Sequence, residues 1–149
     1  MKRLIVFALA AAVVLPFSAR AQGKTDFSGT WTLDASKSDP GRGGGGGGRG
    51  PAGPVVIKQT ATEITVGTAT YKLDGSESVN QMQGRGGTIE AKSKAHWDGA
   101  KLVIDTTRDM GGNAVTSTEV RSLSADGKEM TVETSFNGNT RKTVFTKGM

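Results

Sequence analysis

Apolar and polar side chains alternate with a period of two along much of this chain, and that pattern constrains the fold more than any other feature. It is clearest in residues 88–97. One face of this segment carries Ile89, Ala91, Ser93, Ala95 and Trp97, and the other face is polar or charged. Because successive side chains of a strand point to opposite faces, the segment is predicted to be a half-buried β-strand. No stretch after residue 21 shows helical periodicity, so we expect an all-β protein.

Tight turns separate the expected strands. Asp74-Gly75, Asp98-Gly99, Asp126-Gly127 and Asn137-Gly138 are dipeptides that favour short β-hairpins. Between them the chain holds about eight to ten short strands, which is typical of a barrel or a sandwich. An antiparallel up-and-down succession of this length closes most simply on itself, because closure removes both exposed edges. We therefore expect a single antiparallel up-and-down β-barrel, with a sandwich as the alternative.

The first 21 residues have the pattern of a secretory signal peptide. Lys2 and Arg3 precede the apolar run of residues 4–15, and Ala19-Arg20-Ala21 fits the small-x-small cleavage rule. The run is too short to cross a membrane, which takes about 20 residues. We expect cleavage before Gln22, a mature domain of residues 22–149, and a periplasmic or extracellular location. The processed protein is not expected to span a membrane.

A low-complexity stretch of residues 40–54 follows the first expected strand. It includes six consecutive glycines at positions 43–48, flanked by Arg42 and Arg49. Glycine loses the most backbone entropy on ordering, and this stretch has nothing to bury. We expect a disordered Gly-rich loop within the domain. A helix start followed by Lys and Ser or Thr would be needed for phosphate binding, and neither follows here.

Composition excludes several classes of function. The signal peptide carries three of the 19 basic residues, so 16 face 14 acidic ones and the mature charge is +2. That charge does not predict nucleic-acid binding, which needs a clustered basic face. The chain has one histidine and no cysteine, so we expect neither a metal site nor another cofactor. No catalytic constellation is visible, and we expect no enzymatic activity.

The ends of the mature chain resemble a known family. Residues 27–33 are similar to the Gly-x-Trp opening of lipocalins and fatty-acid-binding proteins. "WDG" at 97–99, "KLVI" at 101–104 and "VFTK" at 144–147 fall in the order of the last hairpins of fatty-acid-binding proteins. Residues 27–38 also resemble the start of a set of small exported bacterial lipocalin-like proteins. The resemblance implies a calycin β-barrel over residues 22–149.

Several residues are expected to have structural roles. Phe27, Gly29, Trp31 and Leu33 should share the inward face of the first strand, with Trp31 closing one end of the barrel. Trp97 should lie in the core from the strand described above. In fatty-acid-binding proteins an Arg and a Tyr of the last strand hold the ligand carboxylate. The corresponding positions here are Thr143 and Phe145.

Small inward residues raise the prospect of an internal cavity. The expected inward faces carry Ala91, Ser93, Ala95, Thr106, Ser117 and Thr134, and large neighbours could either leave space beside them or fill it. In a cavity, Arg108 or Arg121 could pair with an anionic head group, and Tyr71 and Phe136 could line the wall. The leading hypothesis is therefore non-catalytic binding of a small apolar or amphipathic ligand. The alternative is a solid barrel that serves as a protein-interaction module of the cell envelope.

Overall fold

The computed structural model describes residues 24–40, 53–84 and 86–149, and these form one antiparallel sheet of ten strands. The strands are β1 (Gly29–Leu33), β2 (Val55–Gln59), β3 (Glu63–Val66), β4 (Ala69–Lys72), β5 (Glu77–Gly84), β6 (Gly87–Asp98), β7 (Lys101–Asp109), β8 (Ala114–Leu123), β9 (Glu129–Phe136) and β10 (Asn139–Lys147). No helix occurs in these ranges, and the all-β prediction is confirmed.

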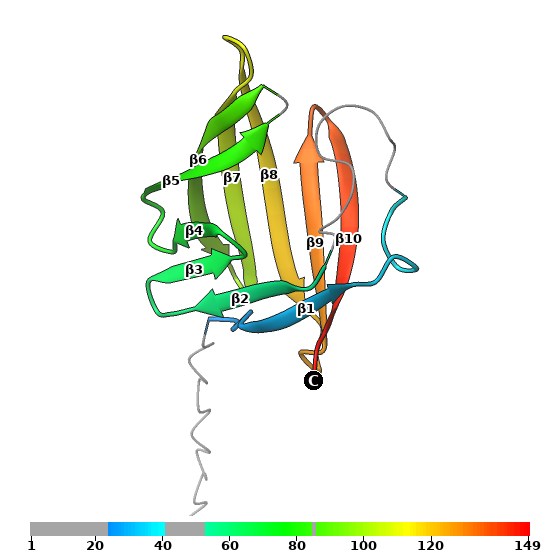
Figure 1. The fold of residues 1–149 in the computed structure, drawn as a ribbon. Coiled ribbons are helices and arrows are strands. Elements are labelled where there is room, and N and C mark those ends of the chain that lie inside the picture. Colours follow the sequence, from blue (N-terminus) through cyan, green and yellow to red (C-terminus); the bar gives the residue numbers. More distant parts are fainter. Residues whose placement is uncertain (1–23, 41–52, 85) are drawn as a thin grey trace, which may run out of the picture.

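The strand order β4-β3-β2-β1-β10-β9-β8-β7-β6-β5 makes the sheet a nearly closed barrel. Strands that follow each other in sequence pair with each other except β4 and β5, and β1 also pairs with β10, so the first and last strands join. In Figure 1 the long strands β6–β10 stand upright, and the short strands β1–β4 cross the lower end. A single curved sheet of this order confirms the predicted barrel over the alternative sandwich.

Side chains close the remaining gap between β4 and β5. These two strands stand at opposite ends of the strand order, so no backbone ladder joins them. The Asn80 side chain accepts a hydrogen bond from the Thr70 N–H at 2.9 Å and donates one to the Thr70 carbonyl at 3.0 Å. The Ser78 hydroxyl accepts a bond from the Lys72 N–H at 2.8 Å. We call this junction the β4–β5 seam.

The lower end of the barrel is packed with apolar side chains. Trp31 is fully buried, and its indole N–H donates a 2.8 Å hydrogen bond to the Phe27 carbonyl. Phe27 is also fully buried and stacks on Trp97, with ring centroids 6.2 Å apart. The buried cluster further includes Ile57, Ile64, Leu73, Ala95, Leu102, Ile104, Met130, Val132 and Phe145. Burial on this scale stabilises the fold, since each large apolar side chain contributes about 1.5–3 kcal/mol.

Gly29 makes room for a cation above the Trp31 ring. Lys147 of β10 lies opposite Trp31 in the β1–β10 register, with its Nζ 5.5 Å from the ring centroid. A Cβ on Gly29 would lie 2.7 Å from Lys147 Cε, and Gly29 has a φ of +140°. The positive φ explains why glycine stands two residues before this tryptophan, and the absence of a Cβ lets the end of the Lys147 side chain lie over the ring.

The expected first strand begins later than its alternation suggests. β1 starts at Gly29, so Phe27 lies just before the strand, although its side chain is buried as predicted. The positive φ of Gly29 interrupts the extended backbone, and the Phe27 N–H donates to the Gln59 side chain at 3.0 Å. Leu33 is half-buried against the core cluster. The polar stretch after it, residues 34–39, runs along β10 and hydrogen-bonds Lys142 and Val144.

Two predictions lie outside the described residues. The signal peptide of residues 1–21 is one, and the Gly-rich loop is the other except for Pro40, Gly53 and Pro54.

Candidate ligand-binding site

The inner face of the long strands carries a row of small hydroxyl side chains. The strand registers place Ser78, Ser93, Thr106 and Ser117 opposite one another across β5, β6, β7 and β8. Paired residues of an antiparallel sheet point to the same side, and Ser93 is only 1% exposed, so the row faces inward. The Ser93 and Thr106 hydroxyls are 2.9 Å apart. The predicted inward orientation of Ser93, Thr106 and Ser117 is confirmed.

Arg121 lies below this row, and its buried guanidinium forms an ion pair with the half-buried Glu119. It is 7% exposed and lies in register with Leu102 and Val132, whose side chains belong to the core. Its Nε and a terminal nitrogen both lie within 2.6 Å of one Glu119 carboxylate oxygen. The other terminal nitrogen is 3.9 Å from the Met130 sulfur. A buried guanidinium needs a counter-charge and hydrogen-bond acceptors, and Glu119 supplies the counter-charge.

Arg108 lies nearer the upper end and has a different partner. It is half-buried on β7, in register with Ala91 of β6 and Val115 of β8. One terminal nitrogen donates to the Ser117 hydroxyl at 3.3 Å. Within the described part of the chain, Arg108 forms no ion pair. The two arginines predicted for the site therefore have unlike environments.

Tyr71 faces the same interior from β4. It lies opposite the buried Ile64 in the β3–β4 register. Burial raises the pKa of the Tyr71 hydroxyl above its usual value of 10.0, and the negative charge of Glu119 raises it further, while Arg121 and Arg108 act in the opposite direction. Its electrostatic neighbours are thus the charged side chains of β7 and β8. We call Tyr71, Arg108, Ser117, Glu119 and Arg121 the inner polar cluster.

Phe136 marks the rim of the barrel. It ends β9 and lies in register with Ser117, which places it on the inward side, yet it is 42% exposed. Met82 of β5 is 40% exposed and lies opposite Ile89 on the same side of the sheet. These two apolar side chains form an accessible apolar rim beside the inner polar cluster.

The sequence interpretation missed Glu119. It stands two residues before Arg121 on β8, so period-two alternation already places both on one face. The signal was present, but the pairing became evident only when burial showed that Arg121 needs a counter-charge. Asn80 and Ser78, which form the β4–β5 seam, were missed for a different reason: local alternation does not reveal which strand ends meet.

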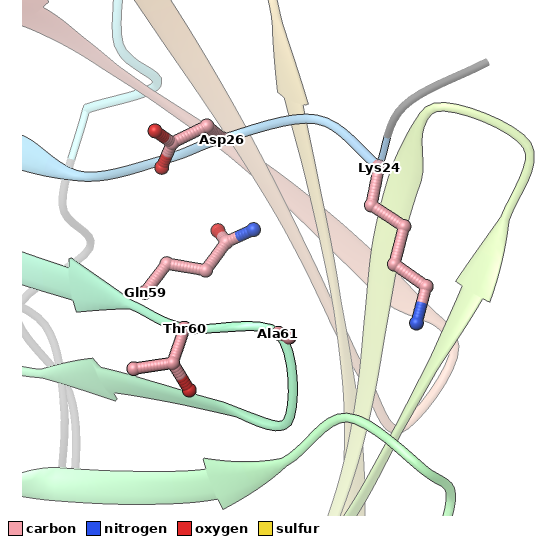
Figure 2. Close-up of a pocket in the computed structure, with 5 residues that line it drawn as sticks. All are labelled: Lys24, Asp26, Gln59, Thr60 and Ala61. Carbon is pink, nitrogen blue, oxygen red and sulfur yellow. The ribbon is translucent and has the colours of Figure 1, made fainter. Parts of the chain in front are cut away.

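A recess lies between the segment before β1 and the turn that follows β2. It has a volume of about 490 Å³ and is lined by Lys24, Asp26, Gln59, Thr60 and Ala61 (Figure 2). The Gln59 side chain is already engaged there: it accepts from Phe27 N–H at 3.0 Å and donates to the Thr25 carbonyl at 2.8 Å. The Ser28 hydroxyl holds the pKa of Asp26 below its usual value. The two hydrogen bonds of Gln59 hold the segment before β1 against the end of β2.

Among the described residues, no group of three or more His, Asp or Glu side chains is arranged to hold a metal ion. The same residues include no helix that is long and apolar enough to cross a bilayer. His96 is exposed on the outer face of β6.

Comparisons with known proteins reveal similarity in fold alone. No protein-family model matches the chain, and no curated protein does. Among solved structures, human cRBP IV matches with a TM-score of 0.51 and 19% identity, over 83% of this chain and 99% of that one. The REP1-NXSQ fatty acid transporter has a TM-score of 0.48 and 12% identity, over 82% and 96% of the two chains. The ten-stranded antiparallel barrel described here is therefore a calycin-type fold, as the sequence resemblance implied.

Proposed function

We propose that this protein reversibly binds a small apolar or amphipathic molecule in its barrel and performs no catalysis. The observation that carries this proposal is the inner face of β5–β8, where small side chains form a band next to the accessible apolar side chains Met82 and Phe136. Ligand sites of proteins are concave and mostly apolar, with a few convergent polar groups. The inner polar cluster supplies such groups, and the fold is shared with human cRBP IV, whose name denotes a retinol-binding protein.

We further propose that the protein acts outside the cytoplasm, as a periplasmic or secreted chain of residues 22–149. The support is the sequence pattern of residues 1–21, which has a basic start, an apolar run and a small-x-small cleavage motif. An intact mass that begins at Gln22 in protein recovered from the host envelope or medium would support this location, and an uncleaved cytoplasmic chain would contradict it.

Adjacent positions on β8 provide a matched test of binding in the interior. Ser117 points inward beside Arg108, whereas Thr116 points outward and contacts Thr107 at 2.9 Å. Ser117→Leu should fill part of the interior and weaken the uptake of a fluorescent lipid probe by tenfold or more, whereas Thr116→Leu should leave it unchanged. Melting temperatures of both variants verify that they remain folded.

The second part of the test is whether the protein already carries a ligand when it is purified from its host. Protein purified from its own host should retain a small molecule in native mass spectrometry. If the protein is empty and also takes up no lipid probe, ligand binding is wrong. Capture of a protein by that empty barrel would then favour the alternative function, an interaction module of the cell envelope.

A further inference from the structure

Two exposed methionines lie at the upper end of the barrel, on the side of the sheet that faces the interior. Resting on the proposed function, we propose that Met82 and Met110 are sites of reversible oxidation to methionine sulfoxide, and that their oxidation weakens the binding of the apolar ligand. The oxidant is a peroxide, and the modified groups are the two thioethers. We call Met82, Ile89 and Met110 the methionine row.

The strand register places the first two members of the methionine row on the inward side of the sheet. Met82 of β5 lies opposite Ile89 of β6. Ile89 shares its face with Ala91 and Ser93, because side chains alternate along a strand, and both of those residues are 1% exposed. Directly opposed residues of an antiparallel pair point to the same side, so Met82 faces inward as well.

Met110 extends the row just beyond the end of β7. Its N–H donates a 2.9 Å hydrogen bond to the Asn113 carbonyl, so the backbone ladder of the β7–β8 hairpin continues through this residue. Arg108 lies opposite Ala91 in the β6–β7 register. Two residues further toward the upper end of both strands, Met110 comes opposite Ile89. In Figure 1 this hairpin forms the uppermost part of the barrel.

The two thioethers of the row are accessible to a small oxidant. Met82 is 40% exposed and Met110 is 51% exposed, whereas Met130, in the core of the same barrel, is 0% exposed. The chain has no cysteine, so no thiol is present to react with peroxide first. Peroxide is therefore expected to oxidise the methionine row and to spare the core.

The oxidation is a balanced two-electron step. The thioether sulfur attacks one oxygen of hydrogen peroxide, and the O–O bond breaks as the S–O bond forms. The sulfur gives up two electrons, one oxygen stays on it, and the other leaves as water. A thiol-dependent methionine sulfoxide reductase reverses the step: two thiols are oxidised to a disulfide, and the oxygen leaves the sulfur as a second water.

Oxidation changes the polarity of the barrel rim and leaves its backbone in place. A thioether is a flexible apolar group, whereas a sulfoxide is polar and accepts hydrogen bonds from water. An apolar ligand that contacts the methionine row would have to dehydrate these polar groups. We expect its affinity to fall about fivefold to twentyfold, which corresponds to the loss of one or two apolar contacts.

Peptide mass mapping after brief treatment with hydrogen peroxide tests the sites themselves. We expect one added oxygen atom at Met82, at Met110 and at the exposed terminal Met149. Met130 should stay unmodified until the protein is unfolded in urea, and its protection shows that the barrel remains folded during the treatment. Protection of Met82 and Met110 in the folded protein would contradict the proposal without reference to any ligand.

Dye titration before and after oxidation tests the consequence for binding. N-phenyl-1-naphthylamine, an uncharged apolar dye, should bind the oxidised wild type more weakly, and reductase with dithiothreitol should restore its affinity. The double variant Met82→Leu, Met110→Leu keeps the apolar volume but forms no sulfoxide, so peroxide should leave its affinity unchanged. Met149→Leu is the matched control. It removes an exposed thioether at the lower end of the barrel and should lose affinity on oxidation as the wild type does.

The outcomes separate the proposed regulation from the proposed function. If sulfoxides at Met82 and Met110 leave dye affinity unchanged, or if the double variant loses as much affinity as the wild type, the regulation is wrong while ligand binding stands. If the unoxidised protein binds no dye, the proposed function fails, and the regulation fails with it.

Discussion

Tyr71 is the only tyrosine of the chain, so its ionisation can be followed without interference. Its pKa is raised, first by burial and then by Glu119, against the opposing effects of Arg121 and Arg108. A phenol whose folded pKa exceeds its unfolded value contributes stability that is complete below about pH 10 and lost as the pH rises toward the folded pKa. Absorbance titration at the phenolate band should therefore show a midpoint above 10.0 in the folded protein.

The matched comparison uses chemical denaturation. Wild-type stability should fall between about pH 10 and the folded pKa more than that of Tyr71→Phe, which keeps the ring and lacks the hydroxyl. A normal midpoint in the folded state, or the same alkaline loss in both proteins, would show that Tyr71 does not occupy the buried position described here.

At the scale of elements, the β4–β5 seam depends on two side chains instead of a backbone ladder. Asn80→Ala removes both hydrogen bonds to Thr70 and leaves its N–H and carbonyl without those partners. We expect a loss of about 1–3 kcal/mol in the free energy of unfolding, and faster amide exchange at Thr70. Asn139→Ala is the control, because Asn139 is exposed and its amide bonds only the nearby Asn137 carbonyl. Equal exchange rates in the two variants would count against the seam.

Sequence analysis predicted the strands of the second half of the barrel and the closure of the sheet, but not the contacts that close it. Strands β6–β10 begin and end within a residue or two of their turn signals, because each hairpin is a local structure with its own turn chemistry. The β1–β10 pairing, the run of residues 34–39 along β10 and the seam join segments far apart in sequence. Such contacts depend on the curvature of the whole sheet, which no window of residues encodes. The same limit applies to the site. Arg108 and Arg121 could be placed inward, but their different partners could not be foreseen.

At the scale of the whole molecule, four similar aspartate–serine pairs stabilise turns and loops of the chain, and we call these pairs anchors. Asp26, Asp34, Asp74 and Asp126 each lie two residues from a serine whose hydroxyl or N–H bonds the carboxylate. In each case the serine hydroxyl is the largest cause of a lowered pKa. Carboxylates of this kind favour the folded state only while they are ionised, so all four turns respond to acid in the same direction.

The sign of the pH dependence follows directly. Because the folded pKa of each aspartate lies below the usual 3.8, the unfolded chain binds protons first as the pH falls. The stabilising contribution is present above about pH 4 and disappears as the pH falls through the folded values. Urea denaturation of wild type and of the double variant Ser36→Ala, Ser76→Ala should therefore differ at pH 7 and converge near pH 2. A gap that persists unchanged at pH 2 would mean that the serines act through packing and not through the charge of their aspartates. Since the other two anchors remain in that variant, its own stability should still decline in acid, only less than that of the wild type.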